Sequence, residues 1–349
     1  MKLMKLLRGD FLRPSGVASA AGNSGKRVIR WQGRAVLLML GCCAMTAFSS
    51  GQTSGVAVDW STVQKVVGGI HGIATAPPKG VVTPKYTSGA LMGNGDIGVV
   101  AGGTTTAECF YFGKSDFWGT HWYEGHDRPE VSILSLGSLT LSSPEQSSGA
   151  DAVYRIDQDI LNAQVLSTLK LGNAVVHVRS WTADGSDLFA AALTTDAGSE
   201  DVPLQLALAM PAPDTALHTA LPSAAGAQGG MLWASRENNL DGATDYKSRA
   251  AIALRLIGAS FTGTTTAASS ATGSFTLHAG ESVWIVAAFK GDSRMGTGGP
   301  SSPELVQAAL GLARTQTVAS VAQLEAAHRQ WWKRFWMRSL VQVHDKVLE

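Results

Sequence analysis

Neither sign of charge dominates this chain of 349 residues, and charged residues of any kind are scarce. Lys and Arg number 28, Asp and Glu number 27, and all four together make up 16% of the sequence. Residues 1–50 hold eight basic residues and one acidic residue, so the remainder has 20 basic and 26 acidic residues. Proteins that bind nucleic acid usually present a basic face. Because the bulk of the chain has no basic excess, we expect no nucleic-acid partner.

Cysteine is almost absent, which excludes a fold held by disulfides. Cys42 and Cys43 lie in an apolar segment near the N-terminus, and Cys109 is alone in the rest of the chain. A single cysteine cannot form an internal disulfide, so the fold must be held by its core. Aromatic residues are also few, at 7%, whereas Gly occurs 39 times. Low charge with abundant Gly, Thr, Ser and Ala favours a β-rich exported protein over a helical cytosolic one.

Long apolar runs are missing too. The segment Ala35–Phe48 has 14 uncharged residues and follows Arg27, Arg30 and Arg34. A span of the ~30 Å hydrocarbon core needs about 20 apolar residues, so we expect no membrane span. A basic flank, a short apolar run and small residues after it are typical of an export signal, and a buried helix or short anchor is the alternative. We therefore expect a periplasmic or extracellular protein with residues 1–50 as its export segment.

A lipid anchor is a further alternative at the N-terminus. Met39-Leu40-Gly41-Cys42 partly resembles a lipoprotein cleavage box, although Met stands where Leu is usual. Lipidation of Cys42 therefore stays open.

Residues 51–299 read as one β domain. Short runs of strand-forming residues alternate with Gly, Asp, Asn and Ser, which predicts an antiparallel sandwich or barrel. In Val175–Trp181, for example, Val176 and Val178 share one face while His177, Arg179 and Trp181 share the other. Thr262–Ser274 is rich in Thr, Ser, Ala and Gly and predicts an exposed loop or hairpin tip. The other predicted strands are Ile97–Ala101, Glu108–Phe112, Val131–Leu141, Tyr154–Ile156, Ala163–Lys170, Leu188–Thr194, Val202–Met210, Ala250–Leu256, Gly273–Leu277 and Ser282–Ala288.

Residues 300–349 change character and predict helices. Ser302-Pro303-Glu304 has the composition of a helix start, followed by a helix to Thr315. A second helix is expected over Val318–Arg338, with Trp331, Trp332, Phe335 and Trp336 on it. Such a heavy apolar face needs a surface to pack against, in the core or, as the alternative, on a membrane. Ser339–Val343 could form one more strand.

The segment Gly93–Gly98 contains G-x-G-x-x-G, which invites comparison with dinucleotide-binding motifs. That motif needs a helix directly after it. Here the apolar run Ile97–Ala101 follows and predicts a strand. Gly93, Asn94, Gly95, Asp96 and Gly98 are therefore interpreted as a tight structural turn, with Gly supplying positive φ.

Several motifs in order resemble the N-terminal β domain of glycoside hydrolases related to families 95 and 65. Leu91–Gly98 resembles the GNG turn that opens those domains, and Lys114–Gly119 resembles the end of the strand after it. In this chain the turn contains Asp96, and the second motif reads Lys-Ser-Asp-x-Trp at Lys114–Trp118. This combination is similar to that of a sister group of family 95. Further likenesses are at Leu136–Leu139, Tyr154–Ile160, Val178–Trp181, Asp187–Ala191 and, for the linker helix, His328–Ser339.

The resemblance implies a galactose-mutarotase-like super-sandwich, a linker of two helices and then an (α/α)6 catalytic barrel. Family enzymes place their catalytic carboxylates on that barrel and cut with inversion. The chain reaches Glu349 where the first barrel helix is expected. We therefore expect a fragment of an α-L-fucosidase-like enzyme, or a β domain that works alone, and we assign no catalytic residue. No cofactor is expected.

Paired carboxylates in the β domain itself are the competing source of catalysis. Glycoside hydrolysis needs two carboxyl groups roughly 5–10 Å apart. Asp96, Asp116, Glu124 and Asp127 are close in sequence. Asp beside Gly or before a strand more often bonds its own backbone, so turn or cap chemistry is the expected role.

The predicted polar and aromatic loop Trp118–Asp127 is the candidate carbohydrate site. Trp118, His121, Trp122 and Tyr123 combine flat apolar rings with polar groups, which suits the C–H faces and hydroxyl rims of sugars. Packing on the linker helices or on the absent barrel is the alternative. His121 and His126 offer no diagnostic metal spacing, so we assign no metal. Two other functions stay open: a free-standing carbohydrate-binding module, and a secreted structural or adhesion sandwich without a ligand.

Overall fold

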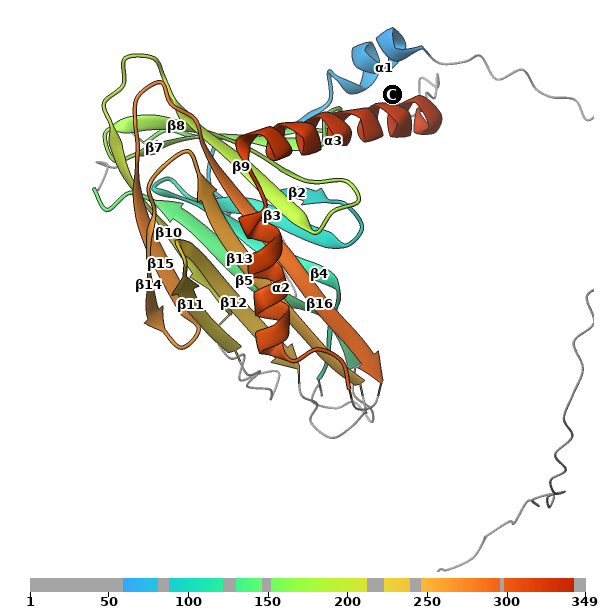
Figure 1. The fold of residues 1–349 in the computed structure, drawn as a ribbon. Helices are drawn as coiled ribbons and strands as arrows, with labels where there is room; N and C mark the ends of the chain where they lie inside the picture. Colours follow the sequence, from blue (N-terminus) through green and yellow to red (C-terminus); the bar gives the residue numbers. More distant parts are fainter. Residues whose placement is uncertain are drawn as a thin grey trace, which may run out of the picture. The chain divides into compact units, whose positions relative to one another are not determined.

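The computed structural model describes residues 59–341, except 81–87, 122–129, 146–151, 212–222, 239–245 and 296–297. In these residues the fold is mainly β, with two antiparallel sheets packed face to face and two helices at the C-terminal side (Figure 1). The predicted fold class is therefore confirmed. No helix in the described ranges has the length and hydrophobicity to cross a bilayer.

The first sheet has nine strands, and its strand order is β1-β6-β7-β8-β9-β16-β13-β12-β11. Neighbouring strands pair antiparallel, with β16 of the C-terminal half inserted between β9 and β13. The strands are β1 (His71–Ala74), β6 (Tyr154–Asp159), β7 (Gln164–Leu171), β8 (Ala174–Thr182), β9 (Leu188–Thr195), β11 (Ser223–Gln228), β12 (Met231–Asn238), β13 (Tyr246–Ile257) and β16 (Val283–Met295).

The second sheet has seven strands in the order β14-β15-β10-β5-β4-β3-β2. Its long central pair, β4 and β5, positions the candidate site described below. The strands are β2 (Ala90–Gly93), β3 (Ile97–Thr104), β4 (Ala107–His121), β5 (Glu130–Ser142), β10 (Val202–Ala209), β14 (Thr262–Ala267) and β15 (Ser270–Leu277).

The main core lies between the two sheets. In β10 every second residue is buried, because alternate side chains of a strand point to opposite faces of the sheet. Phe110, Phe112, Phe189 and Phe289 meet across the interface, with ring centroids 4.9–5.5 Å apart. Aromatic contacts of this kind add to the free energy gained from burying apolar area.

A second core lies on the outer face of the nine-stranded sheet, under helix α2 (Ser302–Arg314). The sheet presents small side chains to this helix, including Ala190, Ala251, Ala253 and Ala288, while Leu305 and Leu310 come from the helix. Small residues on the strands let the helix lie close to the sheet. The C-terminal end of α2 is held by Arg255, whose guanidinium donates to the carbonyls of Arg314 and, at 2.7 Å, Gln316.

Two more helices complete the fold. Helix α1 (Trp60–Val67) begins after Asp59, whose carboxylate accepts from the Thr62 amide at 2.7 Å. Helix α3 (Val318–Ser339) begins after Thr317 and lies beside α1 (Figure 1), with Lys333 Nζ 5.2 Å from the Trp60 ring centroid.

The structure differs from the predicted element bounds in several places. Strand β4 continues to His121, whereas the sequence predicted that the strand ends before Gly113. Thr262–Ser274 forms most of the β-hairpin of β14 and β15, so of the two predicted alternatives, a loop or a hairpin tip, the hairpin is the one observed. Helix α2 is capped by Ser301, not Ser302, and α3 extends through Ser339, with residues 340 and 341 outside any strand. Helix α1 and strands β1, β2, β11 and β12 were not predicted, although α1 has a helical apolar period, with Val63 and Val67 buried on one face.

Candidate functional site

The Gly93–Gly98 motif is a tight hairpin between β2 and β3. Gly93 pairs with Gly98, and the amide of Asn94 donates to the carbonyl of Ile97 at 3.2 Å. Gly95 begins the two-residue turn with φ +90°, a region that L side chains rarely adopt. Strand β3 follows directly, so the helix that a dinucleotide-binding motif requires is not at this position.

The side chain of Asn94 makes four hydrogen bonds, two within its own turn and two to the opposite sheet. Its Oδ1 accepts from the amides of Asp96 at 3.0 Å and Ile97 at 2.8 Å. Its Nδ2 donates to the carbonyls of Ala183 at 2.7 Å and Ser186 at 3.0 Å, in the connection between β8 and β9. Asn94 therefore closes its own turn and holds it against the nine-stranded sheet.

Replacing Asn94 with Ala is expected to lower the free energy of unfolding by about 1–3 kcal/mol, because the four backbone groups lose their partner. Urea denaturation measures this. Asn162 is the matched control, since its side chain donates only locally, to Asp159 at 2.6 Å. Asn162→Ala should cost less than Asn94→Ala. Equal losses would contradict the role given to Asn94 between the two sheets.

A wide bulge in β4 carries the charged residues of the site. Pairing with β5 jumps from Gly113↔Ser135 to Trp118↔Ile133, so the segment from Lys114 to Phe117 bulges out of the ladder. Lys114 is buried, and its Nζ lies 2.8 Å from Asp96 Oδ1 and 3.0 Å from Asp116 Oδ1. The two carboxylates therefore neutralise a cation that the core would otherwise exclude.

Electrostatics fix the charge state of this cluster. Burial alone would raise the pKa of Asp96, but the bonds from Lys114 and Ser115 and the neighbouring Asp187 side chain outweigh it and leave the pKa below its usual value. Burial would likewise lower the pKa of Lys114, and its ion pairs with Asp96 and Asp116 raise it instead. A general acid at neutral pH needs a raised carboxyl pKa. Asp96 is therefore suited to holding the turn and not to protonating a leaving group.

Groups from the other sheet complete the cluster. Lys290 Nζ donates to Asp187 Oδ2 at 2.6 Å. A Cβ on Gly291 would lie 2.5 Å from Asp116 Oδ1, so only Gly leaves room for this carboxylate. Lys290 and Gly291 were missed in the sequence, because they are more than 170 residues from Lys114 and have no local motif. Asp187 was noted within the Asp187–Ala191 likeness but not as a site residue.

Trp118 lies beside the cluster, at the end of the bulge. Its indole Nε1 donates to the Ser115 carbonyl at 2.6 Å. Its own carbonyl accepts from Asn238 at 3.0 Å and from Ser248, both on the nine-stranded sheet. The ring is half-buried, so one part of it packs inside while another part reaches solvent.

The structure brings together part of the predicted site. Asp96 and Asp116 meet at Lys114 in the β4 bulge, and Trp118 lies beside them through its bond to the Ser115 carbonyl. His121 is the last residue of β4, and its side chain lies outside the described residues, as do Trp122, Tyr123, Glu124, His126 and Asp127. Sugar contact by Trp118, His121, Trp122 and Tyr123 therefore stays a prediction. Among the described side chains, no three His, Cys, Asp or Glu gather as metal ligands would.

Comparison with known proteins adds information on the fold. No protein-family profile and no curated protein sequence matches the chain. Among solved structures, the fold is similar to that of a protein described as a kojibiose phosphorylase from the human microbiome, with a TM-score of 0.51 and 11% identity over 76% of this chain. The match spans 38% of that protein, so the likeness covers less than half of its length.

Two further solved structures match more loosely. A family GH92 inverting mannosidase from Bacteroides thetaiotaomicron matches with a TM-score of 0.33 and 9% identity, over 65% of this chain and 32% of its own. A bacterial glucoamylase complexed with acarbose matches with a TM-score of 0.31 and 10% identity, over 76% of this chain and 40% of its own. At these scores only the first likeness bears on the fold.

Proposed function

We propose that this chain is the N-terminal β-sandwich part of an exported, inverting glycoside hydrolase of the α-L-fucosidase-like, family 95 kind. In this proposal the sandwich braces an (α/α)6 catalytic domain, which supplies the carboxylates. The C-terminal end of β4 and the residues that follow it contribute carbohydrate contacts through Trp118, His121, Trp122 and Tyr123. Residues 1–50 would direct export, with Cys42 as a possible lipid attachment point. The motif order described above and the fold shared with part of a kojibiose phosphorylase support it.

The observation that carries the proposal is the aromatic face of α3, defined here as Trp331, Trp332, Phe335 and Trp336. These rings contact mainly one another: Trp331 stacks on Phe335 with centroids 5.5 Å apart, and Trp332 lies 5.1 Å from Phe335. Of the 22 residues of α3, only Val321 and His328 are buried. Phe335 is exposed and the three tryptophans are half-buried, so this helix keeps aromatic surface that is suited to packing against a second domain.

The charge states of the described carboxylates are consistent with a sandwich that supports a separate catalytic domain. The carboxylates that meet at the β4 bulge are engaged by Lys114, and the pKa of Asp96 is lowered. Hydrolysis by inversion needs one carboxylic acid and one carboxylate across the sugar. We therefore place the acid on the helical domain and give the sandwich a supporting role.

Two measurements test the proposal. The DNA that follows codon 349 should encode, in one of its frames, the helices of an (α/α)6 barrel, and an intergenic region there would count against it. The purified 349-residue chain should not hydrolyse p-nitrophenyl α-L-fucoside. Turnover by this chain, abolished by changing Asp96 or Asp116 to Asn, would instead place the catalytic carboxylates in the sandwich.

The aromatic face of α3 predicts self-association of the isolated chain. Phe335 is 36% exposed and Met337 is 40% exposed. We expect concentration-dependent oligomers in analytical ultracentrifugation, and we expect Phe335→Glu to shift the chain towards monomer, because a buried charge would disfavour the contact. Val318→Glu, a change at an exposed apolar residue in the first turn of the same helix, is the control. A monomer at high concentration before any change would argue against a missing partner.

A further inference from the structure

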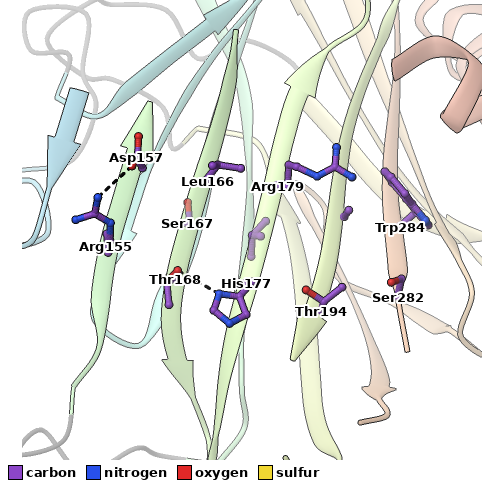
Figure 2. A pocket seen from close by; sticks show the side chains of 12 residues that line it. Arg155, Asp157, Leu166, Ser167, Thr168, His177, Arg179, Thr194, Ser282 and Trp284 are labelled. Atoms are coloured by element: carbon purple, nitrogen blue, oxygen red, sulfur yellow. Dashed lines mark hydrogen bonds and ion pairs between the residues drawn. The ribbon is translucent and has the colours of Figure 1, made fainter. Parts of the chain in front are cut away.

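A polar groove lies on the outer face of the nine-stranded sheet, away from the β4 bulge. It has a volume of about 450 Å³, within the range of ligand pockets. The groove crosses five adjacent strands, β6, β7, β8, β9 and β16 (Figure 2). Four strand spacings of about 4.8 Å give it a length of roughly 19 Å, which suits an extended chain rather than a compact molecule.

Two arginines face the groove from different strands. Arg155 is on β6 and is 47% exposed at its side chain, and Arg179 is on β8 and is 32% exposed. Figure 2 shows them on separate strands, with β7 between them. Arg179 is held in place by Glu325 of α3, and its guanidinium carbon lies 5.3 Å from the ring centroid of Trp181 and 5.7 Å from that of Trp284. This guanidinium is thus oriented before any ligand arrives.

Each acidic group around the groove is already paired with a basic side chain. Asp157 accepts from Arg155 at 3.1 Å through one oxygen and from His71 at 2.6 Å through the other. Glu325 accepts from Arg179 and, at 2.5 Å, from Arg329. Asp196 pairs with His177 at 2.8 Å. Each guanidinium has five N–H donors, so donors remain in excess over acceptors in this groove.

The other lining side chains are suited to a sugar. Thr168, Thr194 and Ser282 present hydroxyl groups, and Thr168 is hydrogen-bonded to His177 Nδ1 at 3.2 Å. Leu166 and Trp284 supply apolar surface on either side. Hydroxyls, an imidazole and apolar walls match a pyranose ring, and the surplus guanidinium donors match planar carboxylates, which Arg binds in bidentate geometry.

We propose that this groove binds a polyuronate, an oligosaccharide whose sugar units carry carboxylates, with Arg155 and Arg179 each pairing with one carboxylate. The site lies beyond the proposed function, which places its sugar contacts at the C-terminal end of β4 and in the residues that follow it. Binding involves no covalent step and leaves the polysaccharide intact.

Affinity electrophoresis of the full chain tests the proposal. Polygalacturonate cast in the gel should retard the chain, neutral dextran should not, and the retardation should weaken as salt rises. Arg155→Ala should weaken the affinity for polygalacturonate about tenfold, because a charge-assisted bidentate contact is lost. Arg155→Lys should also lose a large part of the affinity, since Lys keeps the positive charge but lacks the planar pair of N–H donors that binds a carboxylate in bidentate geometry.

Arg294 provides a matched control. Like Arg155 it pairs with an Asp two residues away on its own strand, at 2.9 Å from Asp292, and it is 44% exposed. Arg294→Ala should leave the retardation unchanged. The proposal is overturned by no retardation in polygalacturonate, by equal retardation in dextran, by retardation only in a sulfated polysaccharide, or by an Arg155→Ala chain that binds like the parent. If polygalacturonate does not retard the chain but the DNA after codon 349 encodes a barrel, the proposed binding by the groove is refuted and the proposed function stands.

Discussion

Replacing Glu108 with Gln should make the protein more stable at pH 8 while leaving its stability at pH 4.5 nearly unchanged. Glu108 is completely buried between the sheets, and its Oε1 accepts from Ser167 Oγ at 2.8 Å. Among the described residues, its Oε2 has no hydrogen-bond partner. Burial raises the pKa of this carboxyl to about 8 from 4.5. The folded protein therefore keeps Glu108 protonated near neutrality.

The sign of the effect follows from proton release on unfolding. Between pH 4.5 and about 8 the folded state holds the proton and the unfolded state does not, so rising pH favours unfolding. Each pH unit in this window costs about 1.4 kcal/mol, which sums to roughly 5 kcal/mol as an upper bound. Gln cannot titrate, keeps the oxygen that accepts from Ser167 and resembles the protonated acid in shape. Glu108→Gln should therefore recover at least about 2 kcal/mol at pH 8.

Urea denaturation of both proteins at several pH values between 4.5 and 8.5 measures this difference. Glu200 is the control, because it is an exposed carboxyl outside the core. Glu200→Gln should follow the parent at every pH. Parallel stability curves for the parent and Glu108→Gln would show that the buried carboxyl does not contribute to the pH dependence.

Replacing Lys114 with Met should have the second large effect and lower the free energy of unfolding by about 2–4 kcal/mol. Lys114 is 6% exposed at its side chain and pairs with both Asp96 and Asp116. Removing one member of a buried ion pair typically costs about 3–5 kcal/mol, because the remaining charge stays without compensation. The two carboxylates are 38% and 35% exposed, so water screens them in part and lowers the expected loss.

Lys290 and Asp187, in the same cluster, provide the comparison. Their side chains are 34% and 30% exposed, so Lys290→Met should cost about 1 kcal/mol or less. Adding Asp96→Asn to Lys114→Met should restore part of the lost stability, because it removes one of the two uncompensated carboxylates. Chemical denaturation of the parent and of these three variants measures the set. Equal losses for the two lysines would show that burial of Lys114 does not matter.

The fold class was predictable because the relevant signals are local. Strand-length runs and turn residues indicate a sandwich, and Ser301 to Glu304 marks the start of α2 within four residues. The bulge in β4 was not predictable, since Gly113-Lys114-Ser115-Asp116 has the composition of a turn. It remains in the sheet because Lys114 finds Asp96, 18 residues earlier, and Gly291 leaves space for Asp116.

The residues of the candidate sites were likewise predictable only where the signal lies within one strand. Alternation in β4 places Glu108 on the same face as Phe110 and Phe112, so a buried carboxyl could have been inferred from the sequence. His177 and Arg179 were correctly expected on one face of their strand. Their neighbours in the groove come from β6, β9 and β16, and only the strand order of the sheet brings Arg155 and Trp284 to the same surface.

The alanines beneath α2 also influence the position of the next helix, α3. Residues 315–317 are all that separate α2 from α3, and Arg255 anchors the end of α2 to the sheet. A bulkier side chain at Ala251 or Ala288 would displace α2 from the sheet and strain its three-residue connection to α3, because α3 is held separately by the bonds of Glu325 to Arg179 and of His328 to the Asn162 carbonyl. The close fit of α2 on these alanines thus fixes the point at which α3 begins.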